Sequence, residues 1–384
     1  MMKLEDCATI IAGQSPKSEY YNTDGNGLPF FQGKADFGEL YPQIRVYCSE
    51  PIRIAEKDDI LLSVRAPVGP TNLAPTKVCI GRGLSAIRPN KEIERKYLLL
   101  YFRYFEAQLS SKGTGTTFKA ITQRTIRNLE IPVLPLEKQQ RIVSRIEDLF
   151  SELDKGVETL QTIKEQLAVY RQAVLKEALN GIKGQPYTVK DVCKEIKVGI
   201  VIKPSQYYTD EQVGIKAFRS ANVREFHVED KNWAYLSIAG HQANARSIVH
   251  TGDILIVRSG YPGTACVVPE QFNGCNAIDI LIAVPNRDLV LPEFLCAYTN
   301  SPLGKKFVNE KKRGVGQKHF NVSGYSKMLI SVPSLDKQEE IVKKIASRLS
   351  VCDSIEQTVD TALAQAEAMR QSILKKAFEG ELCK

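Results

Sequence analysis

Two glycine-rich basic segments hold the side chains best suited to binding a polyanion. The first covers residues 112–119, with Gln123 and Arg124 shortly after it, and the second covers residues 311–319. Glycine lets backbone N–H groups approach an anion closely, and flanking Lys and Arg side chains add positive charge. We therefore predict that both segments contact nucleic acid, with ordinary solvated loops as the alternative. The candidate residues are Lys112, Thr114, Thr116, Lys119, Gln123, Arg124, Lys312, Arg313, Gln317, Lys318 and His319.

Three further arginines form a second group of candidates. Arg65 and Arg258 each follow an aliphatic run and precede a Pro-Val-Gly or Tyr-Pro-Gly turn. Such arginines can reach phosphates or base edges, although a purely structural turn role is equally open. Arg219, beside Phe218, is a weaker candidate of the same kind. Lys34, near Phe31, is a candidate comparable to Arg219. Contact with sugar and phosphate and core packing against the sheet are equally open for Tyr20, Tyr21, Tyr207 and Tyr208.

Residues for catalysis on DNA are missing from the sequence. An adenine methyltransferase would carry an Asn-Pro-Pro-aromatic tetrad, whereas residues 300–303 read Asn-Ser-Pro-Leu and fall inside a predicted helix. A phosphate-binding P-loop is also absent. Asp59 and Asp253 head matched strands, where capping or turn hydrogen bonds are the expected role. We therefore predict no catalytic residue in this chain.

Composition bounds the remaining possibilities. A chain of 384 residues is long enough for two or more domains, and a net charge of +8 permits a polyanionic partner without requiring one. The nine cysteines and four histidines lack metal-ligand spacing, so we predict no metal site. No apolar stretch reaches membrane-spanning length and no signal core follows Met1, so the cytoplasm is the expected location.

An internal repeat governs the organisation of the chain. Residues 136–143 recur at 335–342, residues 171–176 at 370–375 and Gly181 at Gly380, always displaced by 199 residues (136 to 335). Upstream of these segments the displacement between matching residues varies, as expected for loops of different length on a shared scaffold. The sequence therefore predicts two variable halves, each followed by a rigid element of fixed length.

The two rigid elements have the pattern of long helices. Their apolar residues alternate in steps of four and three, with breaks at Gly156 and Arg348, which indicates a heptad seam. The two helices are expected to pair with each other, whereas two unrelated amphipathic helices would leave the constant displacement unexplained. The predicted seam residues are Ile142, Ile146, Leu149, Leu153, Leu160, Ile163, Leu167, Tyr170 and Val174, then Ile341, Ile345, Cys352, Ile355, Val359, Ala362, Ala366, Met369 and Ile373.

The variable halves combine short strands with one helix each. Strand patterns occupy residues 59–64, 78–87, 253–257 and 277–284, and helical patterns occupy about 94–109 and 292–307. Such a mixture predicts an α+β fold in which helices flank a twisted sheet. Prolines near residues 132–135 and 333 are expected to form stiff hinges into the helices.

Over essentially its whole length, the sequence resembles the specificity subunit of type I restriction-modification enzymes. The resemblance rests on Pro-Leu-Glu-Lys-Gln-Gln-Arg-Ile-Val at 135–143, Pro-Ser-Leu-Asp-Lys-Gln-Glu-Glu-Ile-Val at 333–342, and Arg-Gln-Ala-Val-Leu-Lys and Arg-Gln-Ser-Ile-Leu-Lys at 171–176 and 370–375. It implies target-recognition domains at 1–135 and 184–334, and helical spacers at 136–183 and 335–384 that form an antiparallel coiled coil.

The resemblance also implies a function. Each target-recognition domain would read one half of an asymmetric, split site on double-stranded DNA, and the helices would dock two methyltransferase subunits and, through the complex, restriction subunits. The chain itself would be non-catalytic, while S-adenosylmethionine, ATP and Mg²⁺ would belong to partner subunits. Two alternatives remain: a fused enzyme, for which no motif is present, and a protein-binding scaffold with two globular ends on a coiled coil.

Overall fold

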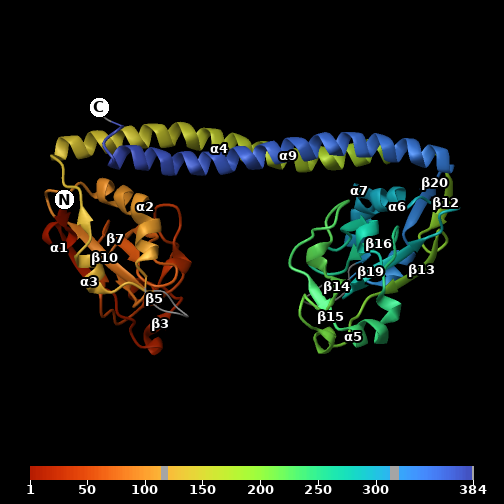
Figure 1. The fold of residues 1–384 in the computed structure, drawn as a ribbon, viewed down its shortest axis with the longest axis horizontal. Coiled ribbons are helices and arrows are strands. Elements are labelled where there is room, and N and C mark those ends of the chain that lie inside the picture. The colour runs from red at the N-terminus through yellow and green to blue at the C-terminus, as the bar shows by residue number, and fades with distance from the viewer. Residues whose placement is uncertain (114–119, 312–319, 383–384) are drawn as a thin grey trace. The chain divides into compact units, whose positions relative to one another are not determined.

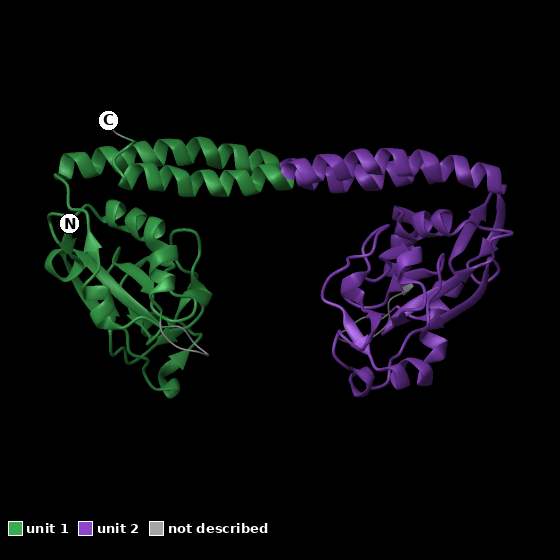
Figure 2. Cartoon of the chain, viewed as in Figure 1, with its two compact units in different colours: residues 1–161, 360–384 green, residues 162–359 purple. Residues whose placement is uncertain are grey.

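The computed structural model describes residues 1–113, 120–311 and 320–382. The chain divides into two units, which are coloured separately in Figure 2. Unit 1 comprises Met1–Gln161 and Asp360–Lys384, and unit 2 comprises Thr162–Val359. Each unit holds a globular part, called head 1 (residues 1–135) and head 2 (residues 184–334), together with segments of the two longest helices (Figure 1).

Head 1 is built on a four-stranded antiparallel sheet with the order β2-β10-β7-β8. A second sheet has the order β3-β5-β4-β9-β6, in which β4 and β9 are parallel, and β1 pairs with β11. The strands are β1 Met2–Lys3, β2 Ala8–Ala12, β3 Tyr21–Asn22, β4 Leu28–Phe31, β5 Tyr47–Cys48, β6 Ile54–Ala55, β7 Ile60–Ser63, β8 Thr71–Leu73, β9 Val78–Ile80, β10 Leu84–Pro89 and β11 Glu130–Ile131. The helices are α1 Leu4–Cys7, α2 Arg95–Ser111 and α3 Gln123–Arg127.

Head 2 repeats the four-stranded sheet and the parallel strand pair of head 1, but its second sheet has three strands in place of five. Its four-stranded antiparallel sheet has the order β13-β19-β16-β17, its second sheet has the order β15-β14-β18 with β14 and β18 parallel, and β12 pairs with β20. The strands are β12 Gln185–Thr188, β13 Cys193–Val198, β14 Ile215–Phe218, β15 Ala234–Leu236, β16 Ile254–Val257, β17 Ala265–Val267, β18 Asn276–Ala277, β19 Ile280–Pro285 and β20 Leu329–Val332. The helices are α5 Ile238–Ala243, α6 Pro292–Asn300, α7 Pro302–Lys311 and α8 Val322–Ser326.

Two helices of 44 residues each, α4 Leu136–Leu179 and α9 Leu335–Phe378, contribute to both units. At 1.5 Å per residue each is about 66 Å long. In unit 1, Leu374 and Ala377 of α9 share a core with Ile142 and Ile146 of α4. In unit 2, Val174 and Leu179 of α4 share a core with residues 341–349 of α9. Gly181 and Gly380 follow the two helices with positive φ, a conformation typical of a helix C-terminal cap.

Equivalent ion pairs join the two helices in each unit. Arg370 pairs with Asp154 in unit 1, and Arg171 pairs with Asp353 at 2.7 Å in unit 2. The predicted seam was wrong at three positions, because Tyr170, Ile355 and Met369 are each more than 40% exposed. At the break predicted at Arg348, the neighbouring Leu349 is buried instead, and Arg348 pairs with Glu177 at 2.6 Å.

Matching buried glutamines attach each head to its helix. Gln139 accepts a hydrogen bond from Glu94 N and donates to Glu92 O and Leu134 O, at 2.8, 2.8 and 2.7 Å. Gln338 likewise accepts from Leu291 N at 2.8 Å and donates to Leu289 O and Pro333 O at 2.9 Å each. Because Glu94 and Leu291 are the N-cap residues of α2 and α6, each glutamine joins the start of a head helix to the start of a long helix.

Three predicted elements are divided in the structure. The strand predicted at 78–87 is broken into β9 and β10 at Gly81-Arg82-Gly83, and the strand predicted at 277–284 is broken between β18 and β19 at Ile278-Asp279. The helix predicted at 292–307 is broken into α6 and α7 at Ser301. Ser301 is extended (φ −68°, ψ 161°), since a residue before proline avoids the helical region.

Candidate nucleic-acid interface

In both heads the chain leaving the glycine-rich segment hydrogen-bonds to the end of a central strand. Ile121 N donates to Val64 O at 3.0 Å just past β7, and Ala120 forms a bridge with Arg65. Phe320 N donates to Arg258 O at 3.1 Å just past β16. The structure therefore places the residues that follow the glycine-rich segments beside the arginines that follow the strands.

Most residues of the glycine-rich segments themselves lie outside the described residues. This applies to Thr114, Thr116, Lys119, Lys312, Arg313, Gln317, Lys318 and His319. The proposed contact of these residues with nucleic acid stays a prediction.

Arg65 and Arg258 do not occupy equivalent positions, which corrects the correspondence expected from sequence. Val64 and Arg258 accept the equivalent hydrogen bonds from Ile121 and Phe320, so Arg65 is equivalent to Ser259. Successive side chains of an extended chain point to opposite sides. Arg258 therefore occupies the position of Val64, whose side chain is buried. Arg65 lies one residue further along the chain, on the opposite side, and is exposed.

Arg258 is held by groups within head 2. Its Nη1 forms an ion pair with the Asp279 carboxylate, and its Nε donates to Phe320 O at 3.2 Å. The side chain is only 16% exposed. In this conformation its charge is neutralised by Asp279, and its main effect is to tie residue 320 to the end of β16.

Arg82 is a candidate that the sequence reasoning missed. It is exposed on the turn between β9 and β10, where its backbone N donates to Ser15 Oγ at 3.2 Å. Gly83 O accepts from Val64 N at 2.9 Å, so Arg82 and Arg65 lie on neighbouring turns of head 1. A Cβ at Gly83 would lie 2.3 Å from Gln32 O, so the close approach requires glycine. The sequence Gly81-Arg82-Gly83, which interrupts a strand pattern, could have indicated an exposed arginine on a turn.

The other candidates differ in how far the fold already uses them. Arg124 is exposed on α3, and Lys112 lies over the Phe105 ring at 5.2 Å. Gln123 is half-buried and donates to Ser85 Oγ at 2.7 Å, which gives it a structural role. Arg219 donates to Asn232 O, and its Nε is buried with no hydrogen-bond partner among the described residues.

The two strand-heading carboxylates have the turn role that was expected. Asp59 accepts from Glu56 N at 2.9 Å and from Arg88 at 2.7 and 2.8 Å, and Asp253 accepts from His250 N at 2.8 Å. Burial raises the pKa of Asp253. Asn300, of the sequence nearest to a methyltransferase tetrad, is buried and hydrogen-bonds to both N and O of Ala265, which is a structural role.

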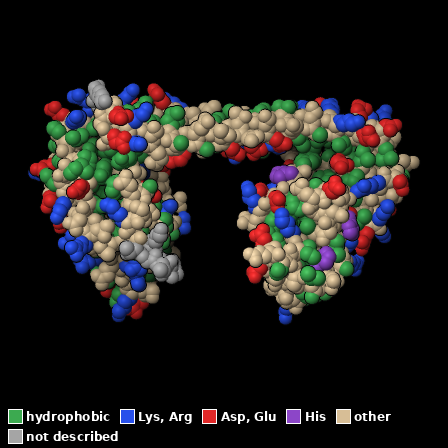
Figure 3. Space-filling view, viewed as in Figure 1, with side chains coloured by type: hydrophobic (Ala, Val, Ile, Leu, Met, Phe, Trp, Pro, Cys, Tyr) green, Lys and Arg blue, Asp and Glu red, His purple; other side chains and the backbone are tan. Residues whose placement is uncertain are grey.

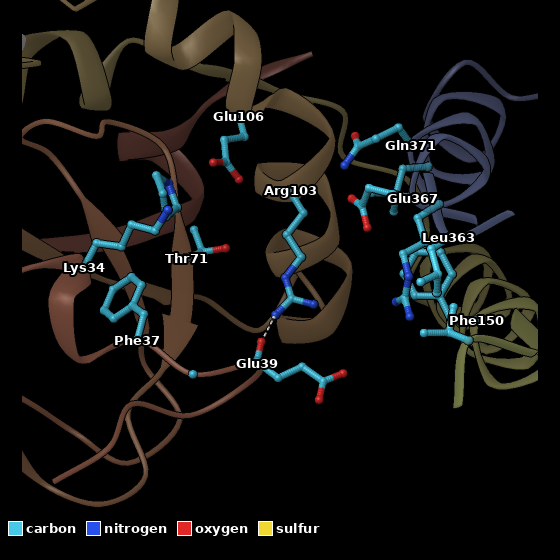
Figure 4. Close-up of a pocket in the computed structure, with 15 residues that line it drawn as sticks. Lys34, Phe37, Glu39, Thr71, Arg103, Glu106, Phe150, Leu363, Glu367 and Gln371 are labelled. Carbon is cyan, nitrogen blue, oxygen red and sulfur yellow. Dashed lines mark hydrogen bonds between the residues drawn. The ribbon is translucent and has the colours of Figure 1, made fainter. Parts of the chain in front are cut away.

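A cavity of about 520 Å³ lies in unit 1 between head 1 and the long helices (Figure 4). Arg103 donates to Glu39 O at 2.6 Å, while Lys34, Glu106 and Arg370 also line the cavity. Burial lowers the pKa of Arg103 and raises that of Glu106. Positive and negative side chains both line the cavity, as is common where a globular part packs on helices. Among the described side chains that line it, no nucleophile is paired with a base, so the cavity does not have the features of a catalytic site.

Positive and negative side chains are mixed over the molecule. Figure 3 shows Lys and Arg together with Asp and Glu on both heads and on the long helices. Helix α4 carries eight acidic and seven basic residues, and α9 carries seven of each. Among residues 1–113, 120–311 and 320–382, no group of three or more His, Cys, Asp or Glu side chains could hold a metal ion. No helix in these ranges is both long and apolar enough to cross a membrane.

Comparisons with known proteins add independent information. The family model described as the type I restriction modification DNA specificity domain matches residues 1–167 and 182–365. The sequence is 41% identical over 173 residues to the putative type I restriction enzyme MjaX specificity subunit of Methanocaldococcus jannaschii, a match that covers 45% of this chain and 40% of the relative. It is 26% identical to the type I restriction enzyme EcoBI specificity subunit of Escherichia coli, with 99% of this chain and 85% of the relative covered.

A solved structure is similar over one part of the chain. The HsdS subunit from Thermoanaerobacter tengcongensis shares 49% sequence identity over 39% of this chain and 37% of that chain, with a TM-score of 0.37.

Proposed function

The chain belongs to the type I restriction-modification DNA specificity family, and from this premise we propose that it is the non-catalytic subunit that selects the DNA sequence on which such a complex acts. The observation that carries the proposal is the double match of the family model, at 1–167 and 182–365. Each match contains one head built on an equivalent four-stranded antiparallel sheet. Two heads on one chain suit a DNA site that has two parts.

We infer that the split site is asymmetric. Two reading heads recognise two half-sites whose separation follows the distance between the heads. The heads share the strand order of their four-stranded sheets but differ in their exposed side chains, since Arg65 is exposed in head 1 whereas Arg258 is ion-paired in head 2. Different side chains on one scaffold favour different bases, so the two half-sites should differ in sequence.

The long helices are proposed to form one antiparallel coiled coil that spaces the heads. This proposal is supported by the packing within each unit. In unit 1 the C-terminal part of α9 packs on the N-terminal part of α4, and in unit 2 the C-terminal part of α4 packs on the N-terminal part of α9. The pairs Arg370–Asp154 and Arg171–Asp353 are related by the same displacement of 199 residues (171 to 370, and 154 to 353). Such a repeat is expected for two helices related by a pseudo-two-fold axis.

On this proposal the chain has four functional parts, with boundaries as predicted from sequence: heads at 1–135 and 184–334, and spacers at 136–183 and 335–384. The long helices have almost no net charge, so they lack the positive surplus that attracts DNA and are available for protein partners. We propose two methyltransferase subunits as those partners, with restriction subunits joining through the complex. S-adenosylmethionine, ATP and Mg²⁺ would be bound by the partners.

Salt-dependent DNA binding tests the role of the heads. The slope of log affinity against log salt reports the number of neutralised phosphates, at about 0.9 per contact. Arg65→Ala should therefore weaken binding and reduce the slope by up to about one contact. Lys155→Ala, which removes the same charge from an exposed position on α4, should leave the slope unchanged. If neither the full chain nor its complex with methyltransferase subunits binds DNA, the scaffold alternative would be favoured instead.

A further inference from the structure

Head 2 exposes three apolar side chains on two neighbouring loops. Val201 is 51% exposed, Ile202 is 79% exposed and Tyr261 is 85% exposed. These three residues are called the apolar tip. Large apolar side chains with this much exposure are costly in water, and several together on one surface indicate an interaction site.

Both loops of the apolar tip start from the Arg258–Asp279 ion pair. Asp279 N donates to Ile200 O at 2.9 Å, so residues 201 and 202 leave the sheet directly beside Asp279. Tyr261 follows Arg258 by three residues. Because Phe320 N donates to Arg258 O, the apolar tip adjoins the strand end to which the second glycine-rich segment returns. The tip is therefore continuous with the candidate nucleic-acid interface.

The turn that carries Tyr261 is fixed in place. Gly263 N donates to Val257 O at 3.0 Å and Tyr261 N to Ser259 O at 3.1 Å. Gly260 and Gly263 have φ of +80° and +90°, and a Cβ at Gly263 would lie 3.0 Å from the Val308 side chain. Because the backbone of this turn is already hydrogen-bonded, binding there costs less backbone entropy than ordering a free loop would.

The corresponding surface of head 1 lacks large exposed apolar side chains. Gln14 N donates to Ile80 O as Ile200 N donates to Ala277 O, so Ser15 corresponds to Val201 and the buried Pro16 to Ile202. Because Arg65 corresponds to Ser259, the position of Tyr261 is occupied by Pro67 in head 1. The exposed Arg65 and Arg82 lie on the same edge, so head 1 carries two arginines where head 2 has the apolar tip nearby.

We propose that the apolar tip reads thymine by contact with its C5-methyl group, so that thymine methyls contribute to the recognition of its half-site by head 2. This inference rests on the proposed DNA-reading function. The thymine methyl is the apolar group that unmodified bases present in the major groove, and apolar side chains recognise it there. Arg258, beside the tip, is paired with Asp279 and is therefore not free to donate to base edges.

Replacing thymine by uracil, which lacks only the methyl group, tests the proposal. The methylated sites of a complex with methyltransferase subunits give the two half-sites. Each thymine in either strand of both half-sites is then replaced in turn, and the affinity of the complex for each duplex is measured. We expect one or more positions in a single half-site to lose about 3- to 10-fold in affinity. Ile202→Ala and Tyr261→Ala should remove that loss, since the contact is already gone.

The outcomes separate the proposal from the function on which it rests. Val351→Ala, a change of an exposed apolar residue on α9, should retain the full sensitivity to uracil. Sensitivity that persists in the tip variants, or uracil that has no effect anywhere, would overturn the methyl contact while leaving specific DNA binding intact. Tip variants that bind DNA normally but assemble poorly with methyltransferase subunits would show a protein-docking surface instead. Absence of any specific DNA binding by the native complex would refute the proposed function itself.

Discussion

Replacing Gln338 by alanine should destabilise unit 2 far more than an exposed glutamine replacement does. The Gln338 side chain is fully buried and makes three hydrogen bonds to backbone groups of Leu289, Leu291 and Pro333. At about 1 kcal/mol net for each bond the loss is about 3 kcal/mol, and buried groups left without partners raise the cost further. Water entering the vacated space lowers it, so we expect about 2–4 kcal/mol.

Trp233 provides a built-in probe for this change. It is the one tryptophan of the sequence, it belongs to unit 2, and its ring packs on Phe218 and Phe272 at 4.9 and 5.2 Å between centroids. Urea unfolding followed by its fluorescence should show a midpoint lower by about 1 M, for a loss of about 3 kcal/mol and an m-value of about 3 kcal/mol/M.

The matched control is Gln166→Ala, at an exposed position of α4 within unit 2. It should change the midpoint little, because alanine is an equal or better helix former than glutamine. If Gln338→Ala and Gln166→Ala gave the same midpoint, the buried glutamine would not be what joins α6 to α9, and the reasoning from its hydrogen bonds would fail.

Three further predictions follow from the same structure. Arg258→Ala should lower the Trp233 urea midpoint, because Phe320 O and Asp279 lose their partner, yet leave the salt slope of DNA binding unchanged; a reduced slope would show that Arg258 contacts phosphate. Exchanging residues 1–135 for those of a relative should change one half-site in the methylated motif, and a change in both would contradict separate heads. Inserting four residues near Gly156 adds about 6 Å, so the spacer between half-sites should lengthen by about one or two base pairs with the half-site bases unchanged. Altered bases with an unchanged spacer would show that the helices do not set the distance.

The sequence was sufficient where a regular pattern continued without interruption. The start of both long helices, at Leu136 and Leu335, agrees with the structure, because apolar spacing and a proline before each helix act together. The α+β character of both heads was predictable for the same reason. The burial of individual seam residues was less predictable. Ile355 and Met369 keep the heptad spacing yet are exposed, because burial depends on which side chains pack against each position.

Prediction failed where local geometry outweighs residue type. Arg65 and Arg258 were matched by residue identity, whereas hydrogen-bond register pairs Arg258 with Val64 and reverses the side on which the arginine lies. Arg82 was overlooked because the strand pattern runs through it, and only the close approach of Gly83 to Gln32 shows a turn there. The buried roles of Gln139 and Gln338 depend on backbone groups of α2 and α6 that lie about 45 residues away in sequence, so spacing alone could not reveal them.

Sequencing of methylated sites, in a host that expresses this chain together with its cognate methyltransferase subunit, tests the central claim most directly. The account predicts methylated adenines within one motif of two unlike half-sites separated by a spacer of fixed length. Expression of the methyltransferase subunit without this chain should leave the motif unmethylated. Methylation that is unchanged when the chain is omitted, or a single undivided motif, would contradict the claim that two heads on this chain select the DNA site.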